Sequence, residues 1–298
     1  MKGDFFLTAK GPGKIFLDYG PVQMLISASS RGKPLAGRQL KAAAGCVKEL
    51  LETLSACLPL AKQPPAAVSG KRRQFPEVLC RMAAAVNATG DTSLTSMAAV
   101  AGTFADCVAD FLQELGADTV IVNNGGDIAL RLPQQEFIRV GIAPFIGSAA
   151  INMTLTIAEQ DGWRGIATSG LGGRSLTQGI ATSVTVLAGS ASLADACATL
   201  IANSTYHEDP SIIRRPAREV DPDTDIAELP VTVALKDPAP EVFRRALENG
   251  LASAQELYSR GLIGGSVLTA GPYCSCFPPE LAARLDLHDS RKITRQTM

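Results

Sequence analysis

The sequence carries almost no net charge and few aromatic side chains. Lys and Arg together number 28 and Asp and Glu number 29, which gives a formal net charge of −1. A chain so balanced has no overall field that would attract nucleic acid or an anionic membrane. Aromatic residues make up 5% of the chain, so a broad base-stacking platform is not expected either. We therefore predict no nucleic-acid partner, and we expect any anionic ligand to be held by local groups.

Long apolar runs are also missing. The longest stretches, such as residues 180–188, fall well short of the roughly 20 residues that a membrane-spanning helix requires. Near the start, Thr8, Lys10, Gly11 and Pro12 interrupt the chain before an apolar segment typical of an export signal can form. We therefore predict no membrane partner and a cytoplasmic location. The oligomeric state cannot be predicted from these features.

Histidine is scarce. The only two histidines are His207 and His288, and neither lies in a motif. His207 follows a predicted helix and is expected at the surface, although it could also approach a ligand site. No Ser stands at a nucleophile elbow, so a Ser-His-Asp hydrolase is not expected.

Cysteine occurs without a disulfide pattern. The seven cysteines are an odd number, and five of them fall in Ala- and Leu-rich helical patterns, which is typical of reduced, buried thiols. Cys274 and Cys276 stand two residues apart and could clasp a metal or form a strained redox pair. No second Cys/His pair stands nearby to complete a tetrahedral site. The alternative is a turn between Pro272 and Pro278, and the sequence leaves the role of the two thiols open.

The sequence does contain clear helical patterns. Apolar residues three or four apart over residues 38–58 predict an amphipathic helix. Pro76 suits the first turn of a second helix that ends near Asn87, and Thr95 or Ser96 suits the cap of a third that ends near Leu115. Between the first two helices, the basic run at residues 71–73 is expected in a surface loop rather than in a phosphate site.

Short β-branched runs fill the middle of the chain and predict a sheet. The expected strands cover residues 19–27, 119–122, 128–132, 137–142, 152–157, 164–168, 181–188, 231–235 and 266–270. Ser192 is expected to cap a helix over residues 193–203, and another helix is expected over residues 240–260. Residues 210–230 are polar and rich in proline. Residues 221–225 superficially suggest a calcium loop but lack the central Gly and terminal Glu of an EF-hand, so we expect an acidic turn there. The whole predicts one α+β domain over residues 1–298, with a disordered tail at residues 289–298.

The run Asn123-Asn124-Gly125-Gly126-Asp127 follows a predicted buried strand. Adjacent glycines let backbone N–H groups approach an anion or a flat ring without a Cβ in the way. Asn124 and Asp127 would add polar contacts. The alternative interpretation is a two-glycine hairpin turn, and the run by itself does not decide between the two.

Two further stretches are rich in small residues and hydroxyl groups. Thr168, Ser169 and Gly170 end a predicted strand and lead into a glycine-rich loop, which is costly to order unless it needs unusual dihedral angles or a close ligand. Asp195 and Thr199 share one face of a predicted helix because they are four residues apart. A carboxylate and a hydroxyl at this spacing are hard oxygen donors that suit Mg²⁺. The alternative is a helical Asp near the positive end of the dipole with a buried Thr.

In this order and spacing, the three stretches resemble the ApbE-like FAD:protein FMN transferases, whose pattern runs Asn-x-Gly-Gly-Asp-Ile, Ala-Thr-Ser-Gly and Ala-Asp-Ala-x-Ala-Thr. The resemblance covers about residues 96–204, and Gly102 and Asp106 match positions of the preceding helix. It implies a two-layer, T-fold-like architecture with antiparallel sheet backed by helices, open to a construction from two similar halves. It also implies FAD or FMN as cofactor, with Mg²⁺ held by Asp195 and Thr199. The nucleotide would then lie along Asn124, Gly125, Gly126, Asp127, Thr168, Ser169 and Gly170.

Departures from the family pattern bear on the reaction. Ala101 stands where the transferases have a Lys, and the segment Gly173 to Gly179 replaces their His-His-Ile-x-Asp-Pro-x-Thr-Gly. The chain thus resembles a cytoplasmic branch of the group that lacks the transferase Lys and His motifs. We expect a small, nucleotide-like ligand and name no catalytic residue. The alternatives are a non-catalytic binding or assembly protein on the same scaffold, or an enzyme acting on another small metabolite.

Overall fold

The computed structural model describes residues 5–68, 74–143, 151, 153–288 and 294–295. The chain divides into two compact units that are interleaved along the sequence. The first unit consists of Met1–Phe137, Ala158–Ala167 and Ala188–Ala196, and the second of Ile138–Ile157, Thr168–Leu187 and Cys197–Met298. A single domain over residues 1–298 stays a prediction, and so does the disordered tail, of which only residues 294–295 lie in the described part.

The first unit contains an antiparallel sheet. Its strand order is β1-β2-β3-β5-β6-β9, with the short β4 paired to β3. The strands are β1 (Phe5–Gly11), β2 (Lys14–Tyr19), β3 (Val22–Ser30), β4 (Lys33–Pro34), β5 (Thr119–Asn124), β6 (Asp127–Arg131) and β9 (Gly165–Ser169), of which β9 belongs to this unit up to Ala167. Only tight turns separate β1, β2 and β3, so the first three strands form a meander.

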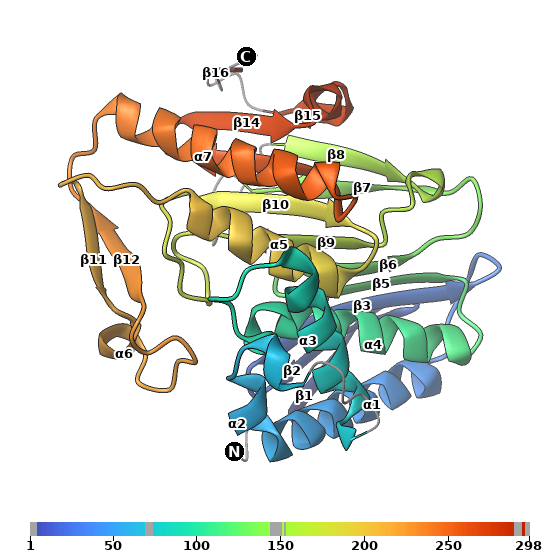
Figure 1. Cartoon of the computed structure of the whole chain (residues 1–298). Coiled ribbons are helices and arrows are strands. Elements are labelled where there is room, and N and C mark those ends of the chain that lie inside the picture. Colours follow the sequence, from blue (N-terminus) through green and yellow to red (C-terminus); the bar gives the residue numbers. More distant parts are fainter. Residues whose placement is uncertain (1–4, 69–73, 144–150, 152, 289–293, 296–298) are drawn as a thin grey trace. The chain divides into compact units, whose positions relative to one another are not determined.

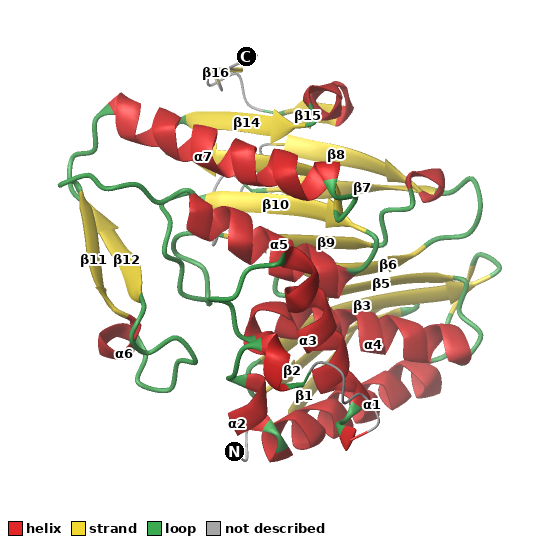
Figure 2. Cartoon of the chain, in the orientation of Figure 1, coloured by secondary structure: helices red, strands yellow, loops and turns green. Residues whose placement is uncertain are grey.

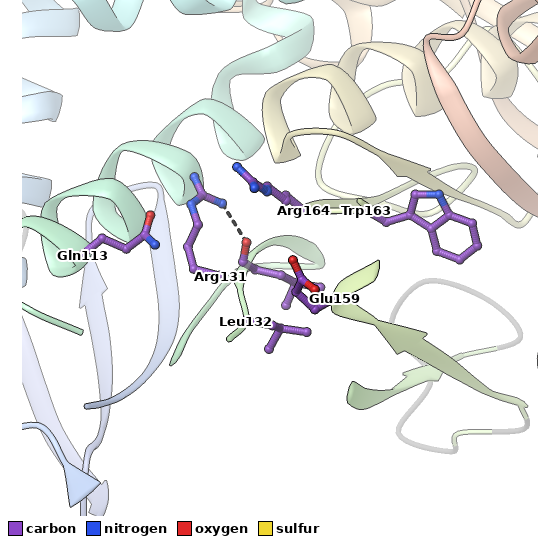
Figure 3. A pocket seen from close by; sticks show the side chains of 7 residues that line it. Gln113, Arg131, Leu132, Glu159, Trp163 and Arg164 are labelled. Carbon is purple, nitrogen blue, oxygen red and sulfur yellow. Dashed lines mark hydrogen bonds between the residues drawn. The ribbon is translucent and has the colours of Figure 1, made fainter. Parts of the chain in front are cut away.

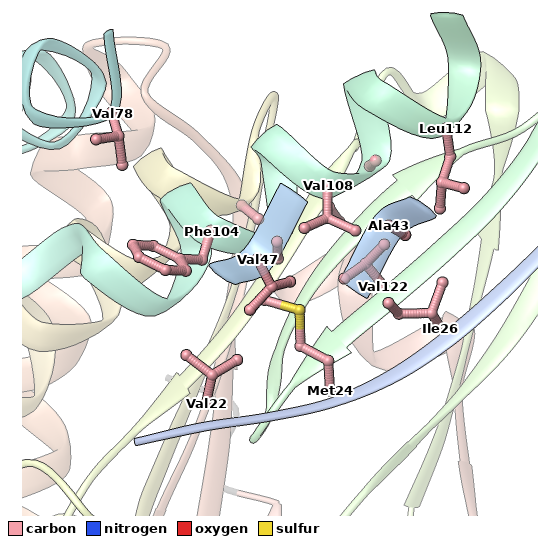
Figure 4. Packing of buried hydrophobic residues seen from close by; sticks show 14 of the residues in the cluster. Val22, Met24, Ile26, Ala43, Val47, Val78, Phe104, Val108, Leu112 and Val122 are labelled. Atoms are coloured by element: carbon pink, nitrogen blue, oxygen red, sulfur yellow. The ribbon is translucent and has the colours of Figure 1, made fainter. Parts of the chain in front are cut away.

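Helices of the first unit pack on one face of this sheet (Figure 1). They are α1 (Gly37–Ala56), α2 (Leu58–Ala61), α3 (Glu77–Thr89) and α4 (Val100–Glu114), with 3₁₀ turns at η1 (Pro65–Ala67) and η3 (Ser96–Ala99). Alternate side chains of β3 and β5, such as Met24 and Val122, point into the core, as the period of a strand requires. They meet Val47 of α1 and Phe104 and Val108 of α4 (Figure 4). This core fixes α4 against the strand that carries the Asn-Asn-Gly-Gly run.

The second unit has its own strands and a long helix. Its order β10-β13-β14-β16 is antiparallel between β13 and β14, and two smaller antiparallel sheets are β11-β12 and β15-β8-β7. Helix α7 (Pro240–Ser259) runs along β13 and β14 (Figure 2). The strands are β7 (Phe137–Ile142), β8 (Met153–Ala158), β10 (Ser183–Ala188), β11 (Ile212–Pro216), β12 (Pro230–Leu235), β13 (Ile263–Ala270), β14 (Tyr273–Phe277), β15 (Leu285–Leu287) and β16 (Thr294–Arg295).

Helix α5 (Ala191–Ser204) and several strands begin in one unit and end in the other. The division falls within α5 between Ala196 and Cys197, and within β9 between Ala167 and Thr168. The shorter helical segments are η4 (Glu159–Asp161), α6 (Ala217–Val220) and η5 (Pro279–Arg284).

The predicted α+β class, with antiparallel sheet backed by helices, is confirmed. The predicted helices occur as α1, α3, α4, α5 and α7, and Thr95 caps η3, directly before α4, by accepting a hydrogen bond from the Met97 amide. The acidic turn is present, with the Thr224 amide donating a 3.2 Å hydrogen bond to the Asp221 backbone oxygen, and β11 and α6, which the sequence did not predict, precede it. Two local predictions were wrong: the Cys274–Cys276 segment is the strand β14 rather than a turn, and Tyr19 ends β2 rather than beginning a strand. The basic run at residues 71–73 lies outside the described residues.

Across the described ranges, we find no helix with both the length and the apolar character that crossing a membrane would need.

Candidate functional site

The Asn-Asn-Gly-Gly-Asp run forms a tight hairpin between β5 and β6. Asn124 pairs with Asp127 across the ladder, so Gly125 and Gly126 are the two turn residues. Their φ angles are 69° and 117°, which only glycine adopts freely at both positions. The Gly126 amide donates a hydrogen bond of 2.9 Å to Oδ1 of Asn123, and a Cβ on Gly126 would meet no atom within 4 Å. The hairpin interpretation is therefore correct, and the turn also leaves open space over its second glycine.

The amide of Asn124 ties this hairpin to the start of α4. Asn124 is 3% exposed, and its Nδ2 donates a 3.0 Å hydrogen bond to the backbone oxygen of Ala101. Its Oδ1 is buried and has no hydrogen-bond partner within the described part of the chain. A buried acceptor without a donor is unfavourable by about 1–3 kcal/mol. This oxygen is thus an acceptor next to the turn that a bound group could use.

Asp195 lies at the other side of the same peptide group. Its Oδ2 accepts a 2.9 Å hydrogen bond from the Gly102 amide in the first turn of α4. The first amides of a helix have no partner within the helix, and a carboxylate there is favoured by the helix dipole. Asp195 therefore caps α4, although it belongs to a different helix, α5.

Asp106 of α4 does the same for α5. Its two carboxylate oxygens accept hydrogen bonds from the amides of Ala191 (3.2 Å) and Ser192 (2.8 Å), and the residue is 4% exposed. The hydroxyl of Ser190 accepts a further bond of 3.2 Å from the Leu193 amide. The prediction that Ser192 caps this helix was wrong, because Ser190 and Asp106 satisfy its first amides.

Glycines let the two helix starts approach each other. A Cβ on Gly102 would lie 2.2 Å from the backbone oxygen of Ala191 and 2.9 Å from Cβ of Asp195. A Cβ on Gly165 of β9 would lie 2.0 Å from the backbone carbon of Ser190. Distances this short exclude any side chain at either position, so both glycines are required by close backbone contact.

A chain of ion pairs connects Asp106 to β6 and α3. Arg131 of β6, with 10% of its side chain exposed, places Nη2 3.4 Å from Asp106 and 2.6 Å from Asp110. Arg81 of α3 contacts Asp110 at 2.6 Å. The two arginines hold the pKa of Asp110 below its ordinary value, against an opposing effect of partial burial. Arg81 also pairs with Glu77 at 2.9 Å, so each arginine of the network is matched by carboxylates and the network orients Asp106 rather than attracting an anionic ligand.

Asp127 and Asp195 are the charged pair of the site. Burial raises the pKa of Asp195 well above its ordinary value, and the carboxylate of Asp127 raises it further. The amides of Gly102 and Ala101 lower the same pKa, but they do not overcome burial. Asp127 begins β6 directly after the glycine turn. Two carboxylates near each other, one of them desolvated, favour either a proton or a cation between them.

The remaining predicted residues belong to the second unit. Thr168 shares a 2.9 Å hydrogen bond with the hydroxyl of Thr185. Gly170 has a φ of 150°, and a Cβ there would lie 2.9 Å from the backbone oxygens of Ala181 and Thr182. Thr199 is half-buried on α5, one turn after Asp195. The structure thus brings Asn124, Gly125, Gly126, Asp127 and Asp195 together within the first unit, whereas Thr168, Ser169, Gly170 and Thr199 lie in the second.

The first unit also contains a small polar cavity of about 80 Å³. Its lining includes Arg131, Arg164, Glu159, Trp163 and Gln113 (Figure 3). The Arg131 side chain in it donates a hydrogen bond to the Leu130 backbone oxygen and is engaged by the ion-pair chain described above. No predicted site residue lines this cavity.

Among the described residues, the histidines and cysteines form neither a metal cluster nor a disulfide. His207 is 9% exposed, so the expectation of a surface position was wrong. The cysteines are free thiols, and burial raises the pKa of Cys274 to about 11. Among the residues that the structure describes, no three His, Cys, Asp or Glu side chains are grouped as a metal cluster would require. A metal at Asp195 would therefore need hydroxyl, amide, backbone or ligand oxygens in addition.

Comparison with known proteins agrees with the sequence pattern. The model of a family described as AbpE bacteria matches residues 6–276. The UPF0280 protein of Methanococcoides burtonii is 39% identical over 132 residues, which cover 44% of this chain and 53% of that protein. The UPF0280 protein of Methanothermobacter thermautotrophicus is 43% identical over 115 residues, or 38% and 43% of the two chains. The chain spans about half the length of the curated relatives it matches.

The solved structures that this chain resembles are more distant in sequence. The flavinyl transferase ApbE of Pseudomonas stutzeri, in its apo form, is 14% identical, with a TM-score of 0.40 over 60% of this chain and 79% of that one. The ApbE protein of Thermotoga maritima is 13% identical, with a TM-score of 0.39 over 68% and 87%. Likenesses of this degree carry no conclusion about ligand or reaction.

Proposed function

We propose, from the premise that this chain belongs to the AbpE bacteria family of ApbE-like proteins, that it binds a flavin nucleotide or nucleotide diphosphate, such as FAD, FMN or ADP, together with Mg²⁺. One observation carries the proposal: the carboxylate of Asp127, at the glycine turn, lies near enough to that of Asp195 to raise its pKa. An anionic phosphate would not enter such a place unaided. A divalent cation reverses the charge and makes it suitable for phosphate oxygens.

The donor set fits Mg²⁺. Asp195 and Thr199 supply a carboxylate and a hydroxyl one helical turn apart on α5, and Asp127 supplies a second carboxylate. Mg²⁺ favours such hard oxygen donors and keeps several waters or phosphate oxygens in its remaining positions. When bound, the ion would neutralise phosphate charge. We assign Asp195 and Thr199 as its ligands and Asp127 as the neighbouring charge that favours its binding.

The residues around the turn suit the nucleotide. The positive φ angles of Gly125 and Gly126 make their backbone accessible to a flat ring or a phosphate. Asn124 would have two roles. Its Nδ2 holds the turn against α4 through the bond to the Ala101 oxygen, and its unpartnered Oδ1 would accept a hydrogen bond from the ligand. By the family resemblance, we assign Thr168, Ser169 and Gly170 to the same ligand.

A second candidate function is a binding or assembly protein without transferase chemistry. Ala101 stands where the transferases have a Lys, and its backbone oxygen is engaged by Asn124. An alanine offers no group for proton transfer or for an electrostatic contact. This position favours a protein that retains the ligand and has lost the reaction.

Calorimetry of the purified protein tests the ligand. We expect FAD or ADP to bind in the presence of Mg²⁺ and at least tenfold more weakly with a chelator. Asp195→Asn and Asp127→Asn should each weaken the Mg²⁺-dependent binding at least tenfold. Asp18→Asn, which alters a carboxylate on β2 hydrogen-bonded to Gln23, is the matched control and should bind as the unaltered chain does. Absence of FAD, FMN and ADP binding with or without Mg²⁺ would contradict the proposal.

A transfer assay separates the two candidates. The protein is incubated with FAD, Mg²⁺ and a threonine-containing acceptor peptide, and the peptide is analysed by mass spectrometry. Covalent FMN on the peptide would rule out a pure binding protein. Binding without transfer supports the second candidate.

A further inference from the structure

Two aspartates exchange helix caps between α4 and α5. On α4, the Gly102 amide donates to Asp195, and Asp106 accepts from α5. On α5, the Ala191 amide donates to Asp106, and Asp195 accepts from α4. In each helix, the donor and the acceptor are four residues apart and therefore share one face. The contact is reciprocal, so each carboxylate holds the helix that carries the other.

The close approach of the two backbones restricts how α4 and α5 can move relative to each other. The 2.2 Å between a Cβ on Gly102 and the Ala191 oxygen shows that no space separates the two helix starts. Asp106 contacts two successive amides, while Arg131 holds the same carboxylate from the strand side at 3.4 Å. Hydrogen bonds between amides and a carboxylate are about twice as strong as neutral ones. Asp106 is therefore fixed from two sides, and α5 is fixed through it.

We propose that Asp106 is a positioning residue for Asp195: by holding the first two amides of α5, it sets the place of the Asp195 carboxylate at the start of α4 and beside Asp127. The effect on ligand binding rests on the proposed function, whereas the positioning itself does not. Asp106 has no direct contact with the glycine turn among its hydrogen bonds, which go to α5 and Arg131. Its contacts act on Asp195 through the position of α5, and the charge of its carboxylate separately raises the pKa of Asp195.

Amide hydrogen exchange, resolved by NMR on the full chain, measures the positioning without any ligand. The Gly102 amide lies in the first turn of α4, so its protection reports the bond to Asp195. In Asp106→Asn, the side-chain NH₂ must face one of the two α5 amides, and we expect Gly102 to exchange at least tenfold faster. Asp110→Asn is the matched control, because Asp110 shares Arg131 but makes no bond to α5. The Gly102 amide of Asp110→Asn should exchange at a rate within twofold of that in the unaltered chain.

The Mg²⁺ concentration that half-saturates FAD binding is the second readout. It should rise at least tenfold in Asp106→Asn and stay within twofold in Asp110→Asn. Unchanged Gly102 exchange in Asp106→Asn, equal effects of both variants, or altered exchange with an unchanged Mg²⁺ requirement would each overturn the proposal. Altered exchange in a chain whose unaltered form binds no nucleotide would support the positioning and contradict only the proposed function.

Folding is followed by circular dichroism throughout. If Asp106→Asn does not fold, Asp106→Ser retains one acceptor and replaces it in both measurements. Failure of both variants to fold would show that Asp106 serves stability alone, and would overturn the positioning role.

Discussion

At the scale of single residues, the carboxyl group of Asp195 is under influences of opposite sign. Burial and the charge of Asp127 disfavour its ionised form, while the Gly102 and Ala101 amides favour it. The net result is a raised pKa. The folded state therefore holds the Asp195 proton to a higher pH than the unfolded chain does.

This raised pKa predicts how stability depends on pH. Between the ordinary value of 3.8 and the raised folded value, the folded state binds more protons at Asp195 than the unfolded state, so its contribution to the free energy of unfolding falls as pH rises. Asp195→Asn removes this titration. We expect the variant to gain stability relative to the unaltered chain as pH rises above about 4, in urea unfolding without metal. If the free energies of unfolding of the two chains differed by the same amount at every pH, Asp195 would not have a raised pKa in the folded state.

Two buried thiols, Cys197 and Cys274, and two half-buried thiols, Cys46 and Cys107, give a second residue-scale prediction. Burial raises the pKa of Cys107 and Cys197 to about 12 and that of Cys46 and Cys274 to about 11. Because the thiolate is the reactive form, these four cysteines should resist a thiol reagent at pH 8 in the folded protein. Mass spectrometry of each cysteine, with the guanidinium-unfolded chain as control, checks this. Rapid labelling of Cys107 or Cys197 in the folded chain is the opposing result.

Sequence spacing could predict part of the site at this scale. The Gly125-Gly126 pair stands out as two adjacent glycines directly after a strand, and Asp195 stands out through its spacing to Thr199 and the family resemblance. The partner of Asp195 does not stand out, because the Gly102 amide is 93 residues away, and Asp106 is 85 residues from Ala191. Backbone amides carry no sequence signal, so reciprocal capping is visible only in the folded chain.

At the scale of elements, the crossing of α4 and α5 depends on glycine. Gly102→Ala would place a Cβ against the Ala191 oxygen and should lower the free energy of unfolding by about 1–3 kcal/mol, as overpacking does. Gly45→Ala, at an exposed position of α1 with no atom within 4 Å, should instead raise it by up to about 1 kcal/mol. Urea unfolding of both variants measures the contrast. Equal effects would mean that the two helix starts are not in close contact.

Elements with a strong period were predictable, and elements defined by a partner strand were not. The spacing of apolar residues gave α1 within two residues of its ends. In contrast, β11 contains two arginines and ends at Pro216, and it exists as a strand through its pairing with β12. Likewise, Cys274 and Cys276 lie in β14 because that strand pairs with β13. Local composition indicates a strand in neither place, and pairing with a distant strand makes each of them one.

At the scale of the whole molecule, the chain passes between its two units five times. The first unit takes β9 and the start of α5 from segments after residue 137. A fragment of residues 1–137 would leave the edge of β6 unpaired and the first turn of α4 without Asp195. The order of the sequence gives no sign of this interleaving, because each segment has an ordinary pattern of its own.

Interleaving predicts that this fragment is much less stable than its length suggests. Residues 1–137 should unfold at a lower urea concentration than the same segments in the full chain. Hydrogen exchange of the backbone amides of β3 and β5, at increasing urea concentration, measures this unfolding. The missing strand pairing and cap together account for the expected loss. Equal protection in the fragment and in the full chain would show that the first unit does not need its later segments.

The shared role of Asp195 as helix cap and proposed metal ligand affects how a loss-of-function variant is read in cells. In Asp195→Asn, the side-chain amide must turn its oxygen toward the Gly102 amide to keep the cap of α4, so the substitution alters the contact between two helices together with the proposed metal site. A loss of function in cells then has two sources, lower protein abundance and missing ligand. Asp127 belongs to a different element, because it begins β6 directly after the turn. Genetic complementation therefore compares both substitutions, with protein levels measured by immunoblot, before a phenotype is ascribed to the ligand.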